Sequence, residues 1–216
     1  MKLEIKKKLL NRSDRVKCVD LHPNLPWILI ALYCGTVMIY DHNSQTQVRS
    51  LEVTNAPVRS ARFIARKQQI IVGSDDNLLR VFNYNTAEKI KTIEEHTDYI
   101  RNIAVHPTQP YVISCSDDDS IRMFDWDKHW AKVNTFVDHE HYIMAVVINP
   151  KDPNMFASGS LDKTIKIWTV GTTKSTANYT LVGHEAGVNC VDFSKDVERP
   201  HLCSGSDDGH VKLWDY

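Results

Sequence analysis

The feature of this sequence that most constrains its fold is a pattern that occurs five times, about forty residues apart. Each copy ends in a short apolar string: VMIYDH (37–42), LRVFNY (79–84), IRMFDW (121–126), IKIWTV (165–170) and VKLWDY (211–216). The aromatic residues shared by these strings are Tyr40, Phe82, Phe124, Trp168 and Trp214. They are spaced by 42, 42, 44 and 46 residues, close to the period of about 40 to 45 of a repeat that forms one four-stranded propeller blade. The sequence therefore predicts an all-β fold.

Two further landmarks recur in phase with the aromatic residue. A histidine precedes it by 28 to 30 residues in the last three copies, at His96, His139 and His184. An acid precedes it by six residues in the last four copies, at Asp76, Asp118, Asp162 and Asp208. Buried imidazole, carboxylate and indole groups are costly unless they hydrogen-bond to one another. We therefore interpret these landmarks as structural.

The strings VGHEAGVNCVDF, SGSDDGHVKLWD and SGSLDKTIKIWT resemble WD40 repeats. The resemblance implies a WD40 β-propeller over residues 1–216, with repeats at about 11–52, 53–94, 95–137, 138–182 and 183–216 and an N-terminal strand at 3–10. It also implies a hydrogen-bonded tetrad of histidine, strand serine or threonine, turn aspartate and tryptophan in each blade. Tetrad residues are then expected at His96, Asp118, His139, Asp162, Trp168, His184, Asp208 and Trp214.

The first two repeats depart from this pattern. Cys34 stands where the turn aspartate is expected, and Arg12 and Asn55 occupy the region of the histidine. Normal tetrads cannot form there, so these blades hold by apolar packing or use the altered positions for binding. Five repeats plus the strand at 3–10 could close a five-bladed ring. The alternative is a fragment of a larger ring, whose unpaired strands would be exposed.

Bulk composition excludes several classes of function. The 26 basic and 27 acidic residues nearly cancel, so no overall field favours nucleic acid. The five cysteines include no CxxC pair and indicate neither a disulfide framework nor a zinc ribbon. The N-terminus carries lysines between its apolar residues, so we expect no signal peptide there, and no apolar run is long enough to span a membrane. His139-Glu140-His141 and Asp117-Asp118-Asp119 could suggest a metal or catalytic site, but the repeat already explains His139 and Asp118. We expect no metal, no cofactor and no catalysis.

Strings outside the repeat consensus, such as NRSDRVKCVDLHP, DYIRNIAVHPTQPY and INPKDPNMFASGSLDKTIKIW, resemble the WD40 subunits of the COPI vesicle coat. This resemblance implies a seven-bladed propeller, which favours the fragment alternative. It implies recognition of C-terminal dilysine tails of membrane cargo during retrograde transport from Golgi to endoplasmic reticulum. The implied partners are such tails and other coatomer subunits. The implied location is the cytoplasm, on Golgi membranes and COPI-coated vesicles, with peripheral attachment through the coat.

A dilysine tail requires cations for its terminal carboxylate and anions for its ammonium groups. Aligning the repeats is expected to place a basic patch from blades one and two opposite an acidic arc from blades three and five, around the mouth of the central channel. We expect Arg15, Lys17 and Arg59 to bind the carboxylate, and Tyr33, Asp98, Asp117 and Asp207 to bind the lysines. The alternative function is a generic WD40 interaction scaffold that does not read dilysine tails, and a propeller hydrolase ranks last.

Overall fold

A computed structural model of the chain describes residues 14–195 and 200–215. The expected strand at 3–10 and Arg12 lie outside the described residues. Five antiparallel sheets follow one another along the chain, four with four strands and one with three among the described residues. The prediction of an all-β propeller with five repeats is confirmed. The one helical element described is the 3₁₀ turn η1 (Ala65–Lys67), and no described helix has the length and apolar character needed to cross a membrane.

Each sheet is one blade, with its strands in chain order. Blade one contains β1 (Val16–Leu21), β2 (Trp27–Leu32), β3 (Thr36–Asp41) and β4 (Thr46–Glu52). Blade two contains β5 (Val58–Ile64), β6 (Gln69–Ser74), β7 (Leu79–Asn83) and β8 (Lys89–Ile93). Blade three contains β9 (Ile100–Val105), β10 (Tyr111–Ser116), β11 (Ile121–Asp125) and β12 (Ala131–Phe136). Blade four contains β13 (Ile143–Ile148), β14 (Met155–Ser160), β15 (Thr164–Thr169) and β16 (Tyr179–Val182), and blade five contains β17 (Val188–Phe193), β18 (His201–Ser206) and β19 (Val211–Asp215).

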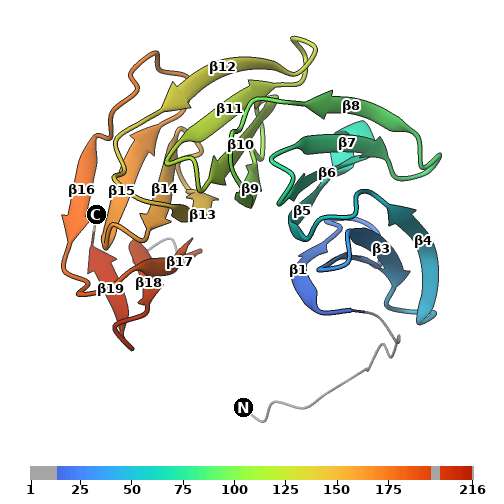
Figure 1. Cartoon of the computed structure of the whole chain (residues 1–216), viewed down its shortest axis with the longest axis horizontal. Helices are drawn as coiled ribbons and strands as arrows, with labels where there is room; N and C mark the ends of the chain where they lie inside the picture. The colour runs from blue at the N-terminus through green and yellow to red at the C-terminus, as the bar shows by residue number, and fades with distance from the viewer. Residues whose placement is uncertain (1–13, 196–199, 216) are drawn as a thin grey trace.

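The blades are arranged side by side in an open arc, with the first strand of each blade on the inner side (Figure 1). The two ends of the arc do not meet, so the described residues do not form the closed five-bladed ring. Apolar side chains are exposed at both ends. In β1, Val19 is 61% and Leu21 68% exposed, and in β19, Val211 is 77% and Leu213 66% exposed. This open arrangement fits the fragment alternative.

In blades one, three and four, the turn between the first and second strands is held by one polar side chain. The Nδ1 atom of His22 accepts the amide of Leu25 at 3.0 Å, and that of His106 accepts the amide of Gln109 at 2.8 Å. In blade four the Oδ1 atom of Asn149 accepts the amide of Lys151 at 2.9 Å. Such local bonds fix the proline-containing turns.

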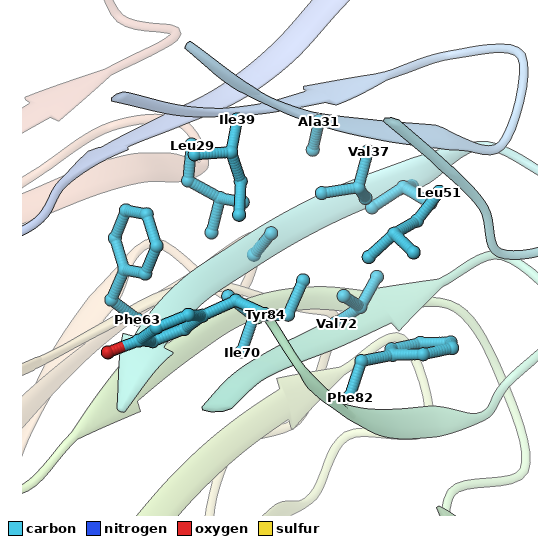
Figure 2. Packing of buried hydrophobic residues seen from close by; sticks show 12 residues of the cluster. Leu29, Ala31, Val37, Ile39, Leu51, Phe63, Ile70, Val72, Phe82 and Tyr84 are labelled. Carbon is cyan, nitrogen blue, oxygen red and sulfur yellow. The ribbon is translucent and has the colours of Figure 1, made fainter. Parts of the chain in front are cut away.

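Apolar contacts between neighbouring blades form the core. Figure 2 shows the cluster between blades one and two, in which Leu29, Ile39, Phe63 and Tyr84 point toward one another. Leu29 and Ile39 are at most 1% exposed, and burial of one such side chain contributes about 1.5 to 3 kcal/mol. Apolar packing therefore joins the two blades that lack a normal tetrad, which is one of the two alternatives that the sequence leaves open.

Candidate functional site

A β-bulge occurs at the start of the first strand of every blade. In blade one, Val16 pairs with Leu32 and Cys18 with Ala31, which leaves Lys17 outside the register. The same shift occurs in the other four blades. The bulged residues are Lys17, Arg59, Arg101, Met144 and Asn189. A bulge turns the extra side chain away from the ladder and is frequent next to binding sites, so each blade presents one such residue.

A repeated backbone hydrogen bond brings a second position beside the bulge. The amide of Tyr33 donates to the carbonyl of Arg15 at 2.8 Å, and the amide of Asp117 donates to that of Tyr99 at 3.0 Å. The same bond joins 75 to 57, 161 to 142 and 207 to 187. We call these positions and the bulged residues the rim. Its members are Arg15, Lys17, Tyr33, Pro57, Arg59, Asp75, Tyr99, Arg101, Asp117, Tyr142, Met144, Leu161, Gly187, Asn189 and Asp207, together with Asp98.

Two rim arginines form bidentate ion pairs within their own blades. In blade two, Arg59 donates through Nε and Nη2 to the two carboxylate oxygens of Asp75, with Nη2 to Oδ2 at 2.6 Å. In blade three, Arg101 donates in the same way to Asp117, with Nε to Oδ1 at 2.6 Å. In blade five, Asn189 donates to Oδ1 of Asp207. The bulged position and the turn position are thus partners in three blades.

Blades one and four differ from this scheme. The guanidinium of Arg15 lies 4.0 Å from the centre of the Tyr33 ring, which is a cation–π contact. Arg15 and Lys17 are exposed, and Tyr33 is half-buried. Blade four carries Met144 and Leu161 where blade three carries Arg101 and Asp117, so this sector of the rim is apolar.

The predicted acidic residues differ in their freedom to bind a ligand. Asp98 is half-buried, its Oδ1 accepts the amide of Tyr99 at 2.8 Å, and it forms no ion pair with any residue that the structure describes. Asp207 is exposed. The side chain of Asp117 is only 3% exposed, and both of its oxygens are bonded to Arg101.

Arg101 and Tyr99 were missed by the sequence analysis. Arg101 follows an apolar residue at the start of its strand, as Lys17 and Arg59 do, and this shared context is the signal that could have found it. Tyr99 is 42% exposed, and the centre of its ring lies 5.7 Å from the guanidinium of Arg59 and 5.9 Å from that of Arg101. A cation therefore lies within the arc that the sequence predicts to be acidic.

The tetrads hold the turns that carry the rim. In blade four, Trp168 donates to Oγ of Ser158 at 2.8 Å, Nε2 of His139 lies 2.7 Å from the same oxygen, and Nδ1 of His139 lies 2.6 Å from Asp162. The same chain of contacts joins Trp214, Ser204, His184 and Asp208 in blade five. Since the turn aspartate directly follows the rim residue in sequence, Leu161 in blade four and Asp207 in blade five, the tetrad fixes the backbone from which that rim residue projects.

Blade three forms the same contacts without a tryptophan. His96 lies 2.8 Å from Asp118 and 2.7 Å from Oγ of Ser114, while Phe124 fills the position of the indole. Burial lowers the pKa of His96 below its ordinary value. Burial alone would raise the pKa of Asp118, but hydrogen bonds from His96 and Ser120 hold it below its usual range. A neutral imidazole beside a carboxylate is consistent with a structural role.

Blade two replaces the tetrad with a different network around Asp76. Oγ1 of Thr54 and Oγ of Ser74 each donate to this carboxylate at 2.6 Å, and Nη2 of Arg80 donates at 2.7 Å. Burial alone would raise the pKa of Asp76, but the bonds from Arg80 and Ser74 hold it well below its usual range. Thr54, rather than Asn55, takes the place of the histidine. In blade one, Cys34 donates to Oγ1 of Thr36 at 3.5 Å.

Two sequence runs could suggest metal or catalytic chemistry, His139-Glu140-His141 and Asp117-Asp118-Asp119. The side chains within these runs have different surroundings in the structure. His139 and Asp118 belong to blade contacts, whereas the exposed ring of His141 packs edge-on against Tyr142 with 4.5 Å between ring centres. Within residues 14–195 and 200–215, no three histidine, cysteine, aspartate or glutamate side chains are grouped so that they could hold a metal ion.

Comparison with protein families gives a match that covers four segments of the chain. The profile of the family described as WD domain, G-beta repeat, matches residues 5–41, 87–125, 130–169 and 175–215. The chain belongs to the WD40 repeat family. The longest unmatched stretch, residues 42–86, covers most of blade two, where the WD40 tetrad is replaced by the Asp76 network.

The curated relatives of this WD40 chain include coat proteins. It is 57% identical over 207 residues to the coatomer subunit beta' of Mus musculus, covering 96% of this chain and 23% of that protein. It is 56% identical over 216 residues to coatomer subunit beta'-2 of Arabidopsis thaliana, covering 100% of this chain and 23% of that protein. A putative coatomer subunit beta'-3 of Oryza sativa subsp. japonica is 58% identical over 207 residues, with 96% and 22% covered. The chain thus spans less than a quarter of the length of these relatives.

Proposed function

We propose that this WD40 chain is part of a COPI coat subunit and that its rim binds the C-terminal dilysine tails of membrane cargo. The observation that carries the proposal is the rim, the set of bulged and turn residues at the starts of the first strands. The rim is cationic in blade one and carries acids in blades three and five. A tail with a terminal carboxylate and two ammonium groups has the complementary charges.

The carboxylate is bound by Arg15, Lys17 and Arg59 in this proposal. Arg15 and Lys17 are exposed, so a ligand reaches them without displacing protein. Asp75 engages Nε and Nη2 of Arg59, which orients the guanidinium and leaves Nη1 for the ligand. A guanidinium held in this way loses little further freedom when it binds a carboxylate.

The ammonium groups are bound by Asp98, Asp117 and Asp207, with Tyr33 packing against the tail. Asp98 forms no ion pair with a described residue, and Asp207 is exposed. Asp117 already bonds Arg101 through both oxygens, so a lysine must share or displace that arginine. The three acids therefore contribute unequally.

The affinity should be modest. A short tail loses conformational freedom on binding, and its charge pairs remain close to water. We expect a Kd on the order of micromolar, or about 8 kcal/mol, that weakens as salt screens the exposed pairs. Several tails on one membrane would raise the apparent affinity by avidity.

The wider role follows from the relatives, which are coatomer subunits by name. We propose other coatomer subunits as partners, peripheral membrane association through the coat, and a cytoplasmic location on Golgi membranes and COPI-coated vesicles. In this role the chain is a binding module that uses no cofactor, performs no catalysis and contacts no nucleic acid.

Fluorescence anisotropy with a labelled peptide ending in Lys-Lys-X-X-COOH tests the proposal. The same peptide with an amidated terminus should bind at least about tenfold more weakly, because the terminal negative charge that pairs with Arg15, Lys17 and Arg59 is lost. Arg59→Met should weaken binding of the acid peptide. Arg49→Met is the matched control, since Arg49 lies on the outer strand β4 and donates to the carbonyl of Asn85. Equal binding of acid and amide peptides would refute the proposal and leave the generic scaffold.

A further inference from the structure

Arg59 and Arg101 occupy the same position in successive blades, yet their surroundings differ in charge. Each is the bulged residue of its first strand, and each forms a bidentate pair with the turn acid of its own blade. Arg59 follows the blade that carries Arg15 and Lys17. Arg101 follows Asp98 by three residues and lies among acids.

The electrostatic surroundings of Arg101 are those of a bound ammonium group. Hydrogen bonds to Asp117 raise the pKa of its guanidinium above the ordinary value, and the charges of Asp117, Asp75 and Asp98 add to this effect. Acids from two blades therefore stabilise one cation, and that cation belongs to the protein.

Burial shows how completely Arg101 covers Asp117. The Asp117 side chain is 3% exposed and that of Arg101 is 19% exposed. An ammonium group from solution reaches Asp117 only if the guanidinium moves, since the Asp117 side chain is almost fully covered and Arg101 bonds both of its oxygens.

We propose that Arg101 is a built-in competitor for the ligand's lysine at Asp117, and that exchange of the two cations limits the affinity and sets the lysine selectivity of the rim. This inference rests on the proposed function. The free rim keeps Asp117 neutralised, which avoids a buried unpaired carboxylate. Binding then replaces one ion pair with another, so the net gain from the ligand's lysine is small at this acid and larger at Asp98.

The decisive variant is Arg101→Met, which keeps most of the aliphatic stem and removes the charge. It should raise the affinity for the Lys-Lys-X-X-COOH peptide by about three- to tenfold, as expected for a partly exposed charge pair. A peptide with both lysines replaced by norleucine should show no such gain. Arg59→Met, at the equivalent bulge, should change the affinity in the opposite direction.

Thermal unfolding gives a second readout that a purely structural role would not produce. The Arg101→Met variant should unfold at a lower temperature than the wild type, because Asp117 loses its partner. The peptide should raise the Tm of this variant more than that of the wild type, because the lysine supplies the missing cation. Combining Arg101→Met with Asp117→Leu should abolish the gain in affinity, and this apolar pair also tests the proposal if the single variant folds poorly.

The outcomes separate the two proposals. Weaker or unchanged binding by Arg101→Met, with amidation-sensitive binding by the wild type, overturns the role of Arg101 and leaves the dilysine function intact. A gain that persists with the norleucine peptide also overturns it, because the effect is then not exchange with lysine. If neither the wild type nor Arg101→Met distinguishes the acid peptide from its amide, the dilysine function fails and the inference fails with it.

Discussion

The indole nitrogen of Trp168 lies 2.8 Å from Oγ of Ser158, whereas blade three has Phe124 at the equivalent place and Ser114 receives no such bond. Trp168 is 1% exposed, so its N–H has no access to water. Trp168→Phe should therefore lower the free energy of unfolding by about 2 kcal/mol, from one lost hydrogen bond and a small cavity. Urea denaturation measures this change.

Ser158→Ala provides the control for Trp168→Phe. The serine also contacts His139, so its loss should cost more than the loss of the indole N–H. The double variant should be less destabilised than the sum of the two single variants, because the same hydrogen bond is removed twice. Strict additivity would show that the bond between Trp168 and Ser158 contributes nothing.

The free energy of unfolding should fall in two steps as the pH is lowered. In blade three, His96 contributes to the first step and Asp118 to the second. Burial lowers the pKa of His96, so its contribution to stability is complete above the unfolded value of about 6.5 and is lost as pH falls below it. The pKa of Asp118 is held below its usual range, so its contribution is lost further down, below about pH 4. In urea titrations between about pH 7.5 and 5, His96→Gln should show a shallower fall in stability than the wild type. Equal slopes would contradict a neutral buried His96.

Two glycines with left-handed backbones should respond differently to alanine. Gly35 has φ +90, and a Cβ there would lie 1.8 Å from the carbonyl oxygen of Thr54. Gly171 has φ +75 and no atom within 4 Å of that position. Gly171→Ala should cost about 1 kcal/mol from backbone strain alone, and Gly35→Ala at least about 3 kcal/mol, because the loop between blades one and two must also shift. Similar midpoints in urea for both variants would rule out this close approach.

Blade two offers a test of which residue replaces the missing histidine. Thr54→Val removes the hydroxyl that donates to Asp76 at 2.6 Å and should cost about 1.5 to 3 kcal/mol, as expected for a hydrogen bond to a carboxylate. Asn55→Ala is the matched control. Asn55 is exposed, and its replacement should change the unfolding free energy by less than about 0.5 kcal/mol. A larger loss of stability for Asn55→Ala than for Thr54→Val would show that Asn55, and not Thr54, takes the place of the histidine.

The difference between Thr54 and Asn55 also shows where sequence reasoning stops. The aromatic residues and turn aspartates locate the blades, because both lie on strands or tight turns whose spacing the ladder fixes. The histidine position lies on a connection between blades, where a shift of one residue decides which side chain reaches the turn acid. Its spacing varies from 28 to 30 residues even in the repeats that keep the histidine.

The rim was partly predictable for a related reason. Alignment of the repeats brings Arg15, Lys17 and Arg59 to one end of the blades, and the structure places all three there. The bidentate ion pairs could not be predicted from the aligned repeats. Each pair joins residues 16 positions apart in sequence, which come into contact because one lies at the bulge and the other at the turn. Arg101 was overlooked among acids, although it shares the strand position of Lys17 and Arg59.

The repeated bulge separates what a blade needs for folding from what it offers to a ligand. The extra residue lies outside the cross-strand register in all five blades, so its side chain has no partner in the ladder to satisfy. Lysine, arginine, methionine and asparagine are all tolerated there on the same backbone. Each blade therefore carries one rim position whose side chain can change without disturbing the strand pairing, and under the proposed function a substitution there changes which tails bind while the fold is kept.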